Sequence, residues 1–416
     1  HETTQIYKNK VIFFSDKEII LSSIKYKNKF LSNNIKLNII KESSNSNLSF
    51  KNLKIRKVII NSKEVNKDDI FFTIKGKKND AHNYLDEVFK KKASIAIVNK
   101  FSKKSIKTKQ IKVNDTLKFL TKCSSLYRSN VNTNIIAITG SAGKTSLKDM
   151  LGITLNKYHQ TFNSKKSFNN KYGVPLSLLN INQKDKFGVI EVGMDKKGEI
   201  DFLSKIIKPD IGLITNIGYA HIKNFKNISE IASAKGEIIN NININGSLVL
   251  NSDDKFFNFH KKLAHKRKIK VFSFSLNKKS ATTSIKKIIK DKNKFKVVLK
   301  INNKEKYFYI KKNFNNFLYN MLATITVMQI YIDTSRFDKN LFFNLKTTEG
   351  RGDISLLKFH KKKIFLIDES YNSNPLSLNS ALQNFDKIGI TENKKHIILG
   401  DMLELGKYSK KLHHSM

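Results

Sequence analysis

The segment NIIAITGSAGKTSLKDMLGITL, residues 134–155, constrains the fold more than any other part of the chain. An apolar strand pattern ends at Thr139, a turn bracketed by Gly140 and Gly143 follows, and a helix pattern begins at Lys144. The apolar residues of that helix recur on one face: Leu147, Met150, Leu151 and Leu155. Glycines let the backbone N–H groups of such a turn face an anion, and the helix N-terminus adds its dipole. The pattern therefore predicts a phosphate-binding loop between a buried strand and a helix.

The loop carries the side chains that nucleotide binding needs. We expect Lys144 to neutralise the β- and γ-phosphates of ATP and the Thr145 hydroxyl to ligate Mg²⁺. Ile138 stands where the strict GxxxxGK pattern has its first glycine, so an ordinary glycine-rich strand-to-helix turn is the alternative. Gly-Lys-Thr at the start of a helix favours the nucleotide site. The expected cofactor-binding residues of the loop are Gly140, Ser141, Ala142, Gly143, Lys144, Thr145 and Ser146.

Apolar strand patterns continue after the loop and alternate with helix patterns. They cover residues 187–194, 210–218 and 246–254, and a hairpin pattern at 294–312 precedes a helix pattern at 314–330. Strands that alternate with helices are typical of a doubly wound parallel sheet. Ligands bind at the carboxyl ends of the strands in such a sheet. We therefore predict an α/β domain whose site lies at those strand ends.

Polar side chains stand at or just beyond two of these strand ends. Glu191 ends one strand pattern, and Asn216 and His221 follow the next. A carboxylate and an imidazole beside ATP phosphates suit a hard cation that is held partly by substrate oxygens. Lys235 follows in the helix pattern EIASAKGEII. The alternatives are structural polar groups for Glu191 and His221 and a solvated side chain for Lys235.

Two further α/β segments flank the central domain, for which we predict residues 131–345. Residues 55–130 contain strand patterns, a short helix pattern and a connecting helix, and we predict a small N-terminal domain there. Residues 346–416 have the same character and are predicted to be a partial third domain. Residues 31–54 include the polar run KESSNSNLS, which is typical of a linker.

The predicted elements of these flanking segments can be stated by residue. In the N-terminal domain they are strands within 69–76 and 93–100 and a helix within 83–92. In the third domain, strands within 363–370 and 395–402 flank a helix that begins at Pro375.

The composition shows 78 Lys and Arg against 34 Asp and Glu, a formal net charge of +44. Nucleic-acid binding requires such charge to be focused on one surface, but here the lysines are scattered through every segment. We therefore expect most of them on solvated faces. The single cysteine, Cys123, excludes an internal disulfide and fits a reducing cytoplasm. No apolar run approaches the ~18 residues of a membrane span.

Several motifs together resemble the Mur ligases, the ATP-dependent amide-forming enzymes of peptidoglycan precursor synthesis. TGSAGKTS resembles the phosphate loop of that family, and EVGM, TNIGYAH and SAKGE resemble its metal-site motifs. FNNKYGVPLSLL, DESYNSNPLSL and LGDMLELG resemble the members that add D-alanyl-D-alanine. The resemblance covers residues 55–416. It implies the three-domain Mur ligase architecture, with a central P-loop parallel-sheet domain and a truncated Rossmann-like C-terminal domain.

The resemblance also implies ATP and two Mg²⁺ ions as cofactors. Thr145, Glu191 and His221 would ligate metal, and Lys235 matches a family lysine that is carbamylated and acts as an anionic ligand. Lys144, His221 and Lys235 would be catalytic. The further nucleotide contacts implied are Arg351 for phosphate, Asp368 for the ribose, and Asn316 and Asn320 near the adenine.

The substrate contacts implied by the resemblance come from three motifs. Ser62 matches the UDP-binding domain, Asn169 and Asn170 lie in FNNKYGVPLSLL, and Tyr371, Asn372 and Asn374 lie in DESYNSNPLSL. The sequence departs from the family pattern near these positions. The departures are Asn315 in place of a histidine, Asn61 and Lys63 in place of aspartate and arginine, and Ala81 in place of glycine.

The activity that the resemblance implies is an ATP-dependent ligation. ATP would phosphorylate the terminal carboxylate of a UDP-N-acetylmuramoyl tripeptide, and the amine of D-alanyl-D-alanine would attack the acyl phosphate. One alternative is another ligase of the superfamily, such as a folylpolyglutamate-type enzyme. The other is a non-catalytic basic protein that binds nucleic acid.

The first 30 residues carry a separate resemblance. HETTQIYKNKVIFFSDKEII is similar to the last segment of the tripeptide-forming Mur ligase, with a chance strand as the alternative. If the match holds, the chain joins the tail of one ligase to the next enzyme of the pathway, and the native protein continues on both sides. We then expect little activity from the isolated chain, since its third domain cannot close fully over ATP. The matching residues are His1, Glu2, Gln5, Phe14, Ser15 and Asp16.

Overall fold

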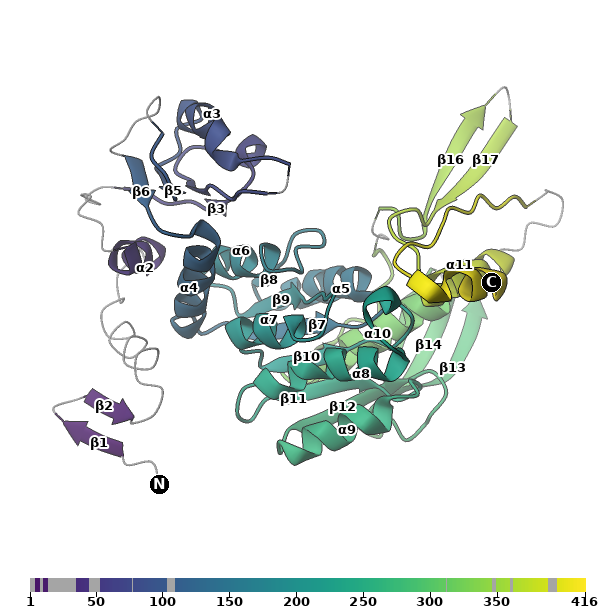
Figure 1. The fold of residues 1–416 in the computed structure, drawn as a ribbon. Coiled ribbons are helices and arrows are strands. Elements are labelled where there is room, and N and C mark those ends of the chain that lie inside the picture. The colour runs from purple at the N-terminus through teal and green to yellow at the C-terminus, as the bar shows by residue number, and fades with distance from the viewer. Residues whose placement is uncertain are drawn as a thin grey trace. The chain divides into compact units, whose positions relative to one another are not determined.

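The structure is a computed structural model of the 416-residue chain. It describes residues 4–7, 10–13, 35–44, 53–76, 78–102, 109–311, 313–345, 349–359, 362–387 and 395–416. The chain forms two compact units (Figure 1). The first unit comprises His1–Thr133 and Lys171–Gln183, and the second comprises Asn134–Asn170 and Lys184–Met416.

The first unit contains a small parallel sheet. Its strands lie in the order β3 (Val58–Ile59), β4 (Ile70–Phe72), β5 (Ile95–Val98) and β6 (Gln110–Lys112). β4 and β5 fall within the predicted strand segments, and α3 (Leu85–Lys90) falls within the predicted helix. β3, β4 and β5 are short and wholly apolar, and all of their residues are buried, as is typical of parallel strands that are covered on both faces.

Three helices complete the first unit. α2 (Ile35–Ser44) packs against α4 (Thr116–Ser129), and α4 packs against α6 (Gly173–Asn180). α4 is the predicted connecting helix. It begins after Asp115, whose side chain accepts hydrogen bonds from two backbone N–H groups of the first turn. α2 lies within the segment predicted to be a linker.

Part of the predicted N-terminal tail is also described. β1 (Thr4–Tyr7) pairs antiparallel with β2 (Lys10–Phe13). The other positions of the proposed ligase tail, including His1, Glu2 and Asp16, lie outside the described residues.

The second unit is built on a nine-stranded sheet with the order β15-β14-β13-β12-β11-β10-β7-β9-β8. All neighbouring strands from β8 to β13 are parallel, while β13, β14 and β15 form an antiparallel extension. The sheet confirms the predicted parallel α/β domain and the predicted hairpin. Its strands are β7 (Asn134–Thr139), β8 (Thr161–Asn163), β9 (Phe187–Glu191), β10 (Ile211–Ile214), β11 (Ser247–Asn251), β12 (Lys270–Ser275), β13 (Thr283–Asp291), β14 (Lys294–Ile301) and β15 (Lys304–Ile310).

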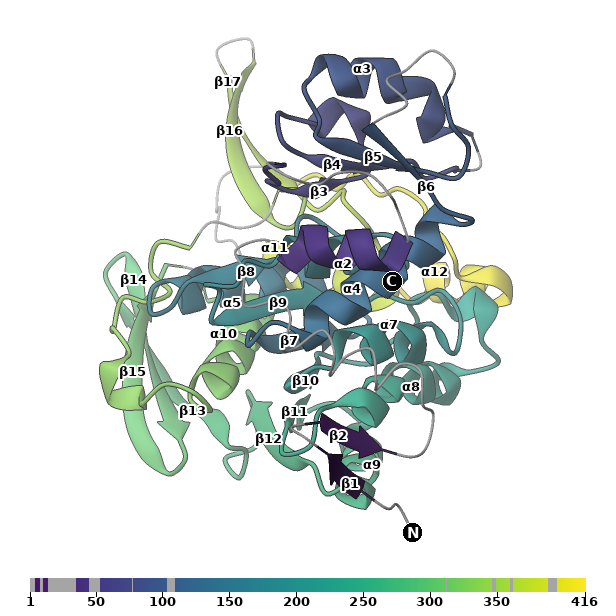
Figure 2. The same ribbon diagram turned by 90° about the vertical axis from the view of Figure 1, so that its left-hand side faces the viewer.

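Helices cover both faces of this sheet. In Figure 2 the strands β7 and β10 to β12 run between α5 and α10 on one side and α7, α8 and α9 on the other. α5 and α10 pack against each other and contribute apolar side chains to one continuous core with β7, β9, β10, β14 and β15. The helix bounds are α5 (Lys144–Asn156), α7 (Glu199–Ile207), α8 (Ile228–Gly236), α9 (Phe257–Lys266) and α10 (Asn315–Met328).

The C-terminal part of the second unit differs from the prediction in one element. The antiparallel strands β16 (Asp353–Phe359) and β17 (Lys362–Asp368) and the helix α11 (Pro375–Asp386) form, and α11 confirms the predicted helix. The predicted strand within 395–402 is wrong, because these residues have no regular secondary structure. No described strand pairs with this stretch, and Ile398 is 97% exposed, so neither backbone pairing nor burial holds it extended in a sheet. Two short elements follow, η7 (Gly406–Tyr408) and α12 (Ser409–His414).

No helix in the described parts of the chain is long and apolar enough to cross a membrane.

Candidate active site

The predicted phosphate loop joins β7 to α5. Gly140 has φ 143° and Gly143 has φ 81°, both in the region where L side chains are strained. A Cβ on Gly140 would also lie 1.8 Å from Oγ1 of Thr215. Position 140 therefore admits glycine alone, for both backbone and steric reasons.

The residues that follow β10 hold this loop in place. Thr215 Oγ1 donates to the Ala142 carbonyl at 2.7 Å, and the Ala142 N–H donates to Asn216 Oδ1 at 2.9 Å. The Gly218 N–H donates to Ser141 Oγ at 2.8 Å, and that hydroxyl donates to the Gly218 carbonyl at 3.1 Å. The TNIG part of the TNIGYAH motif thus acts on loop geometry, a role that sequence reasoning did not assign.

Lys144 lies at the first position of α5 and folds back over the loop. Its Nζ donates to the Gly140 carbonyl at 2.8 Å. Burial lowers the pKa of Lys144, the Glu191 carboxylate raises it, and the Arg351 guanidinium lowers it further. The Arg351 cation is therefore close to this ammonium group, as suits an anion-binding site, and the Glu191 carboxylate is close to it as well.

Glu191 and Thr145 meet at the carboxyl end of β9. Thr145 Oγ1 donates to Glu191 Oε2 at 2.7 Å, and Asn169 Nδ2 donates to Glu191 Oε1 at 2.8 Å. The structure thus brings together a hydroxyl, a carboxylate and the amide of Asn169. Oxygen ligands of this kind are those that Mg²⁺ prefers. Asn170, the next residue, is exposed.

Lys148 supports this arrangement, although sequence reasoning did not select it. Its side chain is buried, and its Nζ donates to the Ser164 carbonyl at 2.6 Å and to the Lys166 carbonyl at 2.8 Å. These carbonyls belong to the segment that leads to Asn169. The only signal in the sequence is a lysine one helical turn after Lys144. The sequence does not show whether that lysine is buried or exposed.

His221 and Lys235 lie beyond the end of β10 and in α8. The side chain of His221 is 28% exposed, and its Nδ1 is 3.5 Å from Asp195 Oδ1 and in contact with Glu404 Oε2. Burial lowers the pKa of His221, and the Lys235 and Lys144 ammonium groups lower it further, whereas Glu404 and Asp195 raise it. His221 therefore lies within electrostatic range of the phosphate loop.

Lys235 is 1% exposed. Burial holds its pKa well below the usual range, and the Lys144 ammonium lowers it further. Its amine has no hydrogen-bond or ion-pair partner among the residues that the structure describes. The alternative of a solvated lysine is wrong, since the helix faces this side chain inward.

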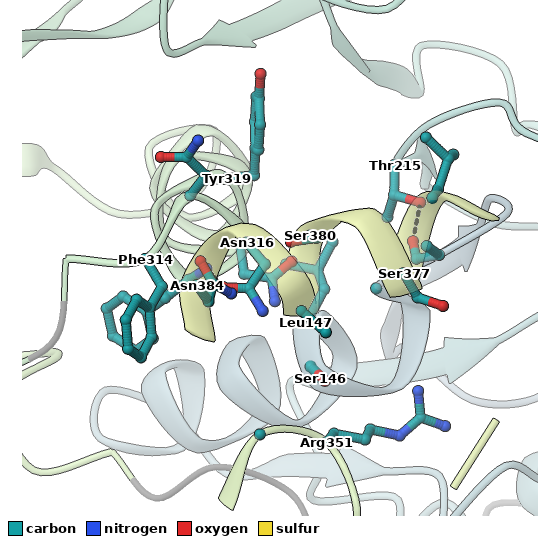
Figure 3. A pocket seen from close by; sticks show the side chains of 18 of the residues that line it. Ser146, Leu147, Thr215, Phe314, Asn316, Tyr319, Arg351, Ser377, Ser380 and Asn384 are labelled. Carbon is teal, nitrogen blue, oxygen red and sulfur yellow. Dashed lines mark hydrogen bonds between the residues drawn. The ribbon is translucent and has the colours of Figure 1, made fainter. Parts of the chain in front are cut away.

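A cavity of about 490 Å³ lies beside the phosphate loop, between α5, α10 and α11. Figure 3 shows Ser146 and Leu147 on one side of it and Ser377, Ser380 and Asn384 of α11 on another. The predicted nucleotide contacts Asn316, Asn320 and Arg351 line the cavity. Asp368 ends β17, where it accepts a hydrogen bond from the Ser370 N–H at 2.8 Å, and it is not among the lining residues.

Sequence reasoning missed three residues that line the cavity: Asp253, Tyr319 and Glu369. Tyr319 OH donates to Asp253 Oδ2 at 3.2 Å, and Asp253 also accepts from Ser275 Oγ at 2.6 Å. Glu369 lines the cavity too, and burial raises its pKa to about 7. Tyr319 lies in α10 and Asp253 follows β11, so their hydrogen bond joins distant segments and leaves no local signal in the sequence.

The predicted substrate residues of DESYNSNPLSL lie in the turn that leads into α11. Tyr371 OH is 2.7 Å from Ser167 Oγ, and the Arg351 guanidinium lies 4.2 Å from the Tyr371 ring centroid. Asn374 caps α11 by accepting from the N–H groups of Leu376 and Ser377. Asn372 lines the cavity. Ser62 lies in the first unit, where its carbonyl accepts a hydrogen bond from Lys91.

Similar proteins are known for most of this chain. A family model described as the Mur ligase middle domain matches residues 138–328. A UDP-N-acetylmuramoyl-tripeptide–D-alanyl-D-alanine ligase of Rickettsia prowazekii is 32% identical over 364 residues, which are 86% of this chain and 78% of the relative. The enzyme of the same name from Buchnera aphidicola subsp. Baizongia pistaciae is 30% identical, with 90% of this chain and 81% of the relative covered.

Solved structures are similar over the same extent. The crystal structure of MurF from Acinetobacter baumannii matches with a TM-score of 0.78 and 26% identity, and covers 91% of this chain and 81% of that one. MurF ligase from Thermotoga maritima, in complex with ADP, matches with a TM-score of 0.73 and 26% identity, and covers 88% of this chain and 82% of that one. Both the sequence relatives and the structural neighbours therefore show that this chain belongs to the Mur ligase family.

Proposed function

We propose that this chain is an ATP-dependent ligase that adds D-alanyl-D-alanine to a UDP-N-acetylmuramoyl tripeptide. The observation that carries the proposal is the contact of Thr145 with Glu191 directly behind the phosphate loop. Ala142 and Gly143 of that loop line a cavity of about 490 Å³. The relatives that cover most of the chain bear the name of this activity. ATP and a UDP-linked substrate are cytoplasmic compounds, which is the location we propose.

The nucleotide is proposed to bind with its phosphates on the loop and its base toward α10. Ser141, Ala142 and Gly143 would offer backbone N–H groups, and Lys144 would leave the Gly140 carbonyl to meet the β- and γ-phosphates. Asn316 and Asn320 would contact the adenine. Asp368 would reach the ribose only after a shift, since it does not line the cavity.

The donor set of Thr145 and Glu191 fits Mg²⁺, because it offers oxygen atoms beside the place where phosphate oxygens would complete the ligand shell. A bound Mg²⁺ would neutralise phosphate charge during transfer. Asn169 would keep the second oxygen of Glu191 fixed, and so orient the first toward the ion.

The ligation requires two substrates to meet in a fixed geometry. The tripeptide carboxylate would attack the γ-phosphorus of ATP, and the ADP oxygen would leave. The amine of D-alanyl-D-alanine would then attack the acyl phosphate, losing a proton and releasing phosphate. Lys144 and Arg351 lie close enough to interact electrostatically and would offset the charge that builds up on the transferred group.

Lys235 is proposed to act as a carbamate. Burial favours its neutral amine, which is the form that combines with CO₂ to give a carbamate and a proton. The carbamate would be an anionic oxygen ligand, and with His221 it would hold a second Mg²⁺. An unpaired buried amine is costly unless it is neutral or modified.

The remaining substrate roles rest on position. Ser62 would contact the UDP moiety from the first unit, and Asn169, Asn170, Tyr371, Asn372 and Asn374 would lie around the site where D-alanyl-D-alanine meets the acyl phosphate. The fusion of a preceding ligase at residues 1–30 remains a separate proposal.

One coupled assay tests the function. Phosphate release from ATP is measured with the UDP-linked tripeptide, with and without D-alanyl-D-alanine. We expect release to depend on both substrates. Release that needs a folate and glutamate instead would favour a folylpolyglutamate-type ligase. No ATP turnover together with DNA affinity that falls steeply with salt would favour the nucleic-acid alternative.

A further inference from the structure

The motif LGDMLELG, residues 399–406, has entered the site so far only through the contact of Glu404 with His221. Its second half lies against the segment that follows His221. The Lys223 N–H donates to the Glu404 carbonyl at 3.1 Å, and Tyr408 OH donates to the Lys226 carbonyl at 2.5 Å. Leu405 is buried. The segment 402–408 is therefore docked by backbone, side-chain and apolar contacts at once.

The two carboxylate oxygens of Glu404 contact different residues. Its Oε1 is 3.4 Å from Lys223 Nζ, while its Oε2 contacts Nδ1 of His221. Asp195 Oδ1 approaches the same Nδ1 at 3.5 Å. Nδ1 of His221 is buried, makes no hydrogen bond of standard geometry among the described residues, and is faced by two carboxylates, one from the loop after β9 and one from the C-terminal segment.

The backbone at this contact is strained on both sides. His221 has φ 59° and Glu404 has φ 67°, so two non-glycine residues in the left-handed region face each other. Such conformations persist where the surroundings over-determine them, and they cluster at functional sites. Neither residue needs this conformation to close a hairpin, because neither lies in a β-turn between paired strands.

A carboxylate on one ring nitrogen of histidine decides what the other can do. The nitrogen that faces the carboxylate keeps the proton, and the opposite nitrogen keeps its lone pair for a metal ion. We infer that Glu404 is a positioning residue that holds the proton of His221 on Nδ1 and leaves Nε2 free to ligate the catalytic cation. Docking of segment 402–408 and completion of the metal site are then one event. This inference rests on the proposed function.

The first test reads the tautomer directly, in the 416-residue chain labelled with nitrogen-15 histidine. His221 is assigned by the loss of its signals in His221→Gln. We expect the Nδ1–H form in the parent chain and a mixture of tautomers in Glu404→Ala. The variant Glu404→Gln still offers an oxygen to Nδ1–H and should remain close to the parent. The same tautomer mixture in parent and Glu404→Ala would overturn the inference.

The second test measures Mn²⁺ affinity by electron paramagnetic resonance, with a non-hydrolysable ATP analogue bound. Loss of such a supporting carboxylate costs roughly 10–100-fold in metal affinity, and we expect a loss of that size in Glu404→Ala. Lys223→Met is the matched control, since it removes the contact to Oε1 and leaves Nδ1 covered. Equal losses in both variants would mean that docking alone matters and would contradict a role for the Nδ1 contact.

Three further outcomes separate this inference from alternative explanations. Hydrogen exchange across residues 402–408 shows whether Glu404→Ala releases the segment, and Tyr408→Phe weakens docking without touching the carboxylate. If Tyr408→Phe reproduces the tautomer change while hydrogen exchange shows that segment 402–408 is still docked, the inference fails. Mn²⁺ bound without nucleotide, and lost equally in Asp195→Ala and Glu404→Ala, would make the cluster itself the ligand set and would also overturn it. If the parent binds no Mn²⁺ with the nucleotide, the proposed function fails, while the tautomer test still decides the role of Glu404.

Discussion

The phosphate loop and the C-terminal segment from Gly350 onward belong to the same compact unit but are stabilised in different ways. In the loop, the polar groups of Ser141 and Ala142 are paired with the residues that follow β10, and the strand below is buried. In the C-terminal segment, large apolar side chains such as Phe365 and Ile398 are exposed by 60% and 97%. The loop is held by a core, whereas the C-terminal segment is held by individual contacts.

The difference indicates where the site is rigid and where it depends on docking. Lys144, Thr145 and Glu191 are placed by the central sheet itself. Arg351, Tyr371 and Glu404 reach the same site from outside that sheet, through a ring contact, a hydroxyl pair and a strained turn. Substitutions in the first group should change stability and chemistry together, and those in the second should change chemistry with little effect on stability.

The largest effect is expected at Lys144. Lys144→Ala removes the cation that faces the transferred phosphoryl group, and turnover should fall by roughly 10²–10³, about 3–4 kcal/mol, which is the usual scale for one electrostatic stabiliser. Phosphate release under saturating substrates measures it. The control is Lys262→Ala, an exposed lysine in α9. Turnover of Lys144→Ala within twofold of that of the control would mean that Lys144 does not act on the phosphates.

A backbone test of the loop comes next. Gly140→Ala forces a Cβ to within 1.8 Å of Thr215 Oγ1 at a φ that only glycine tolerates, so we expect the free energy of unfolding to drop by about 2–4 kcal/mol. Gly198→Ala is the matched control: φ is 87°, but nothing lies within 4 Å of the added Cβ. It should cost only about 1 kcal/mol. Chemical denaturation measures the free energy of unfolding of both variants. Gly198→Ala reports backbone strain alone, and Gly140→Ala reports backbone strain together with the steric clash.

Burial of Lys148 predicts an intermediate effect. Lys148→Met keeps the length of the side chain but leaves the Ser164 and Lys166 carbonyls without their donor, so stability should fall by about 1–3 kcal/mol. The segment before Asn169 should loosen, and the Mg²⁺ concentration needed for half-maximal nucleotide binding should rise. A fall in stability without any change in Mg²⁺ dependence would limit Lys148 to a structural role.

The core around the phosphate loop could be predicted from the sequence, because the features that define it lie within one short stretch of the chain. A strand pattern ends at Thr139, glycines follow, and the apolar residues of α5 then recur with helical spacing. Such patterns can be recognised without knowing the rest of the fold. The hairpin of β14 and β15 is local in the same way. The strands β8 and β12 are short or polar at their ends and were missed.

The contacts between distant segments were not accessible. Nothing near Lys148 shows that it is buried, and nothing near Glu404 shows that it meets His221. The stretch around Ile398 has the composition of a strand, but composition does not supply a partner to pair with. Position in the fold, which a single sequence does not contain, decides these three cases.

The smallest effect is expected where the apolar surface is open. Ile398→Ser changes a side chain that is 97% exposed, so the free energy of unfolding should change by less than about 0.5 kcal/mol. Leu155→Ala, in the buried face of α5, should cost about 2–5 kcal/mol by the same denaturation measurement. Similar losses in the free energy of unfolding at both positions would show that the two regions are not stabilised in different ways.

The most direct test of the central claim follows an oxygen atom. The UDP-linked tripeptide is labelled with oxygen-18 in its terminal carboxylate and incubated with ATP, Mg²⁺ and D-alanyl-D-alanine, and the phosphate released is analysed by mass spectrometry. Because the carboxylate oxygen that attacks ATP leaves with phosphate when the amine attacks the carbonyl, each phosphate should carry a single labelled oxygen, and the peptide product should gain D-alanyl-D-alanine. Unlabelled phosphate, or phosphate release without the peptide product, would contradict the account.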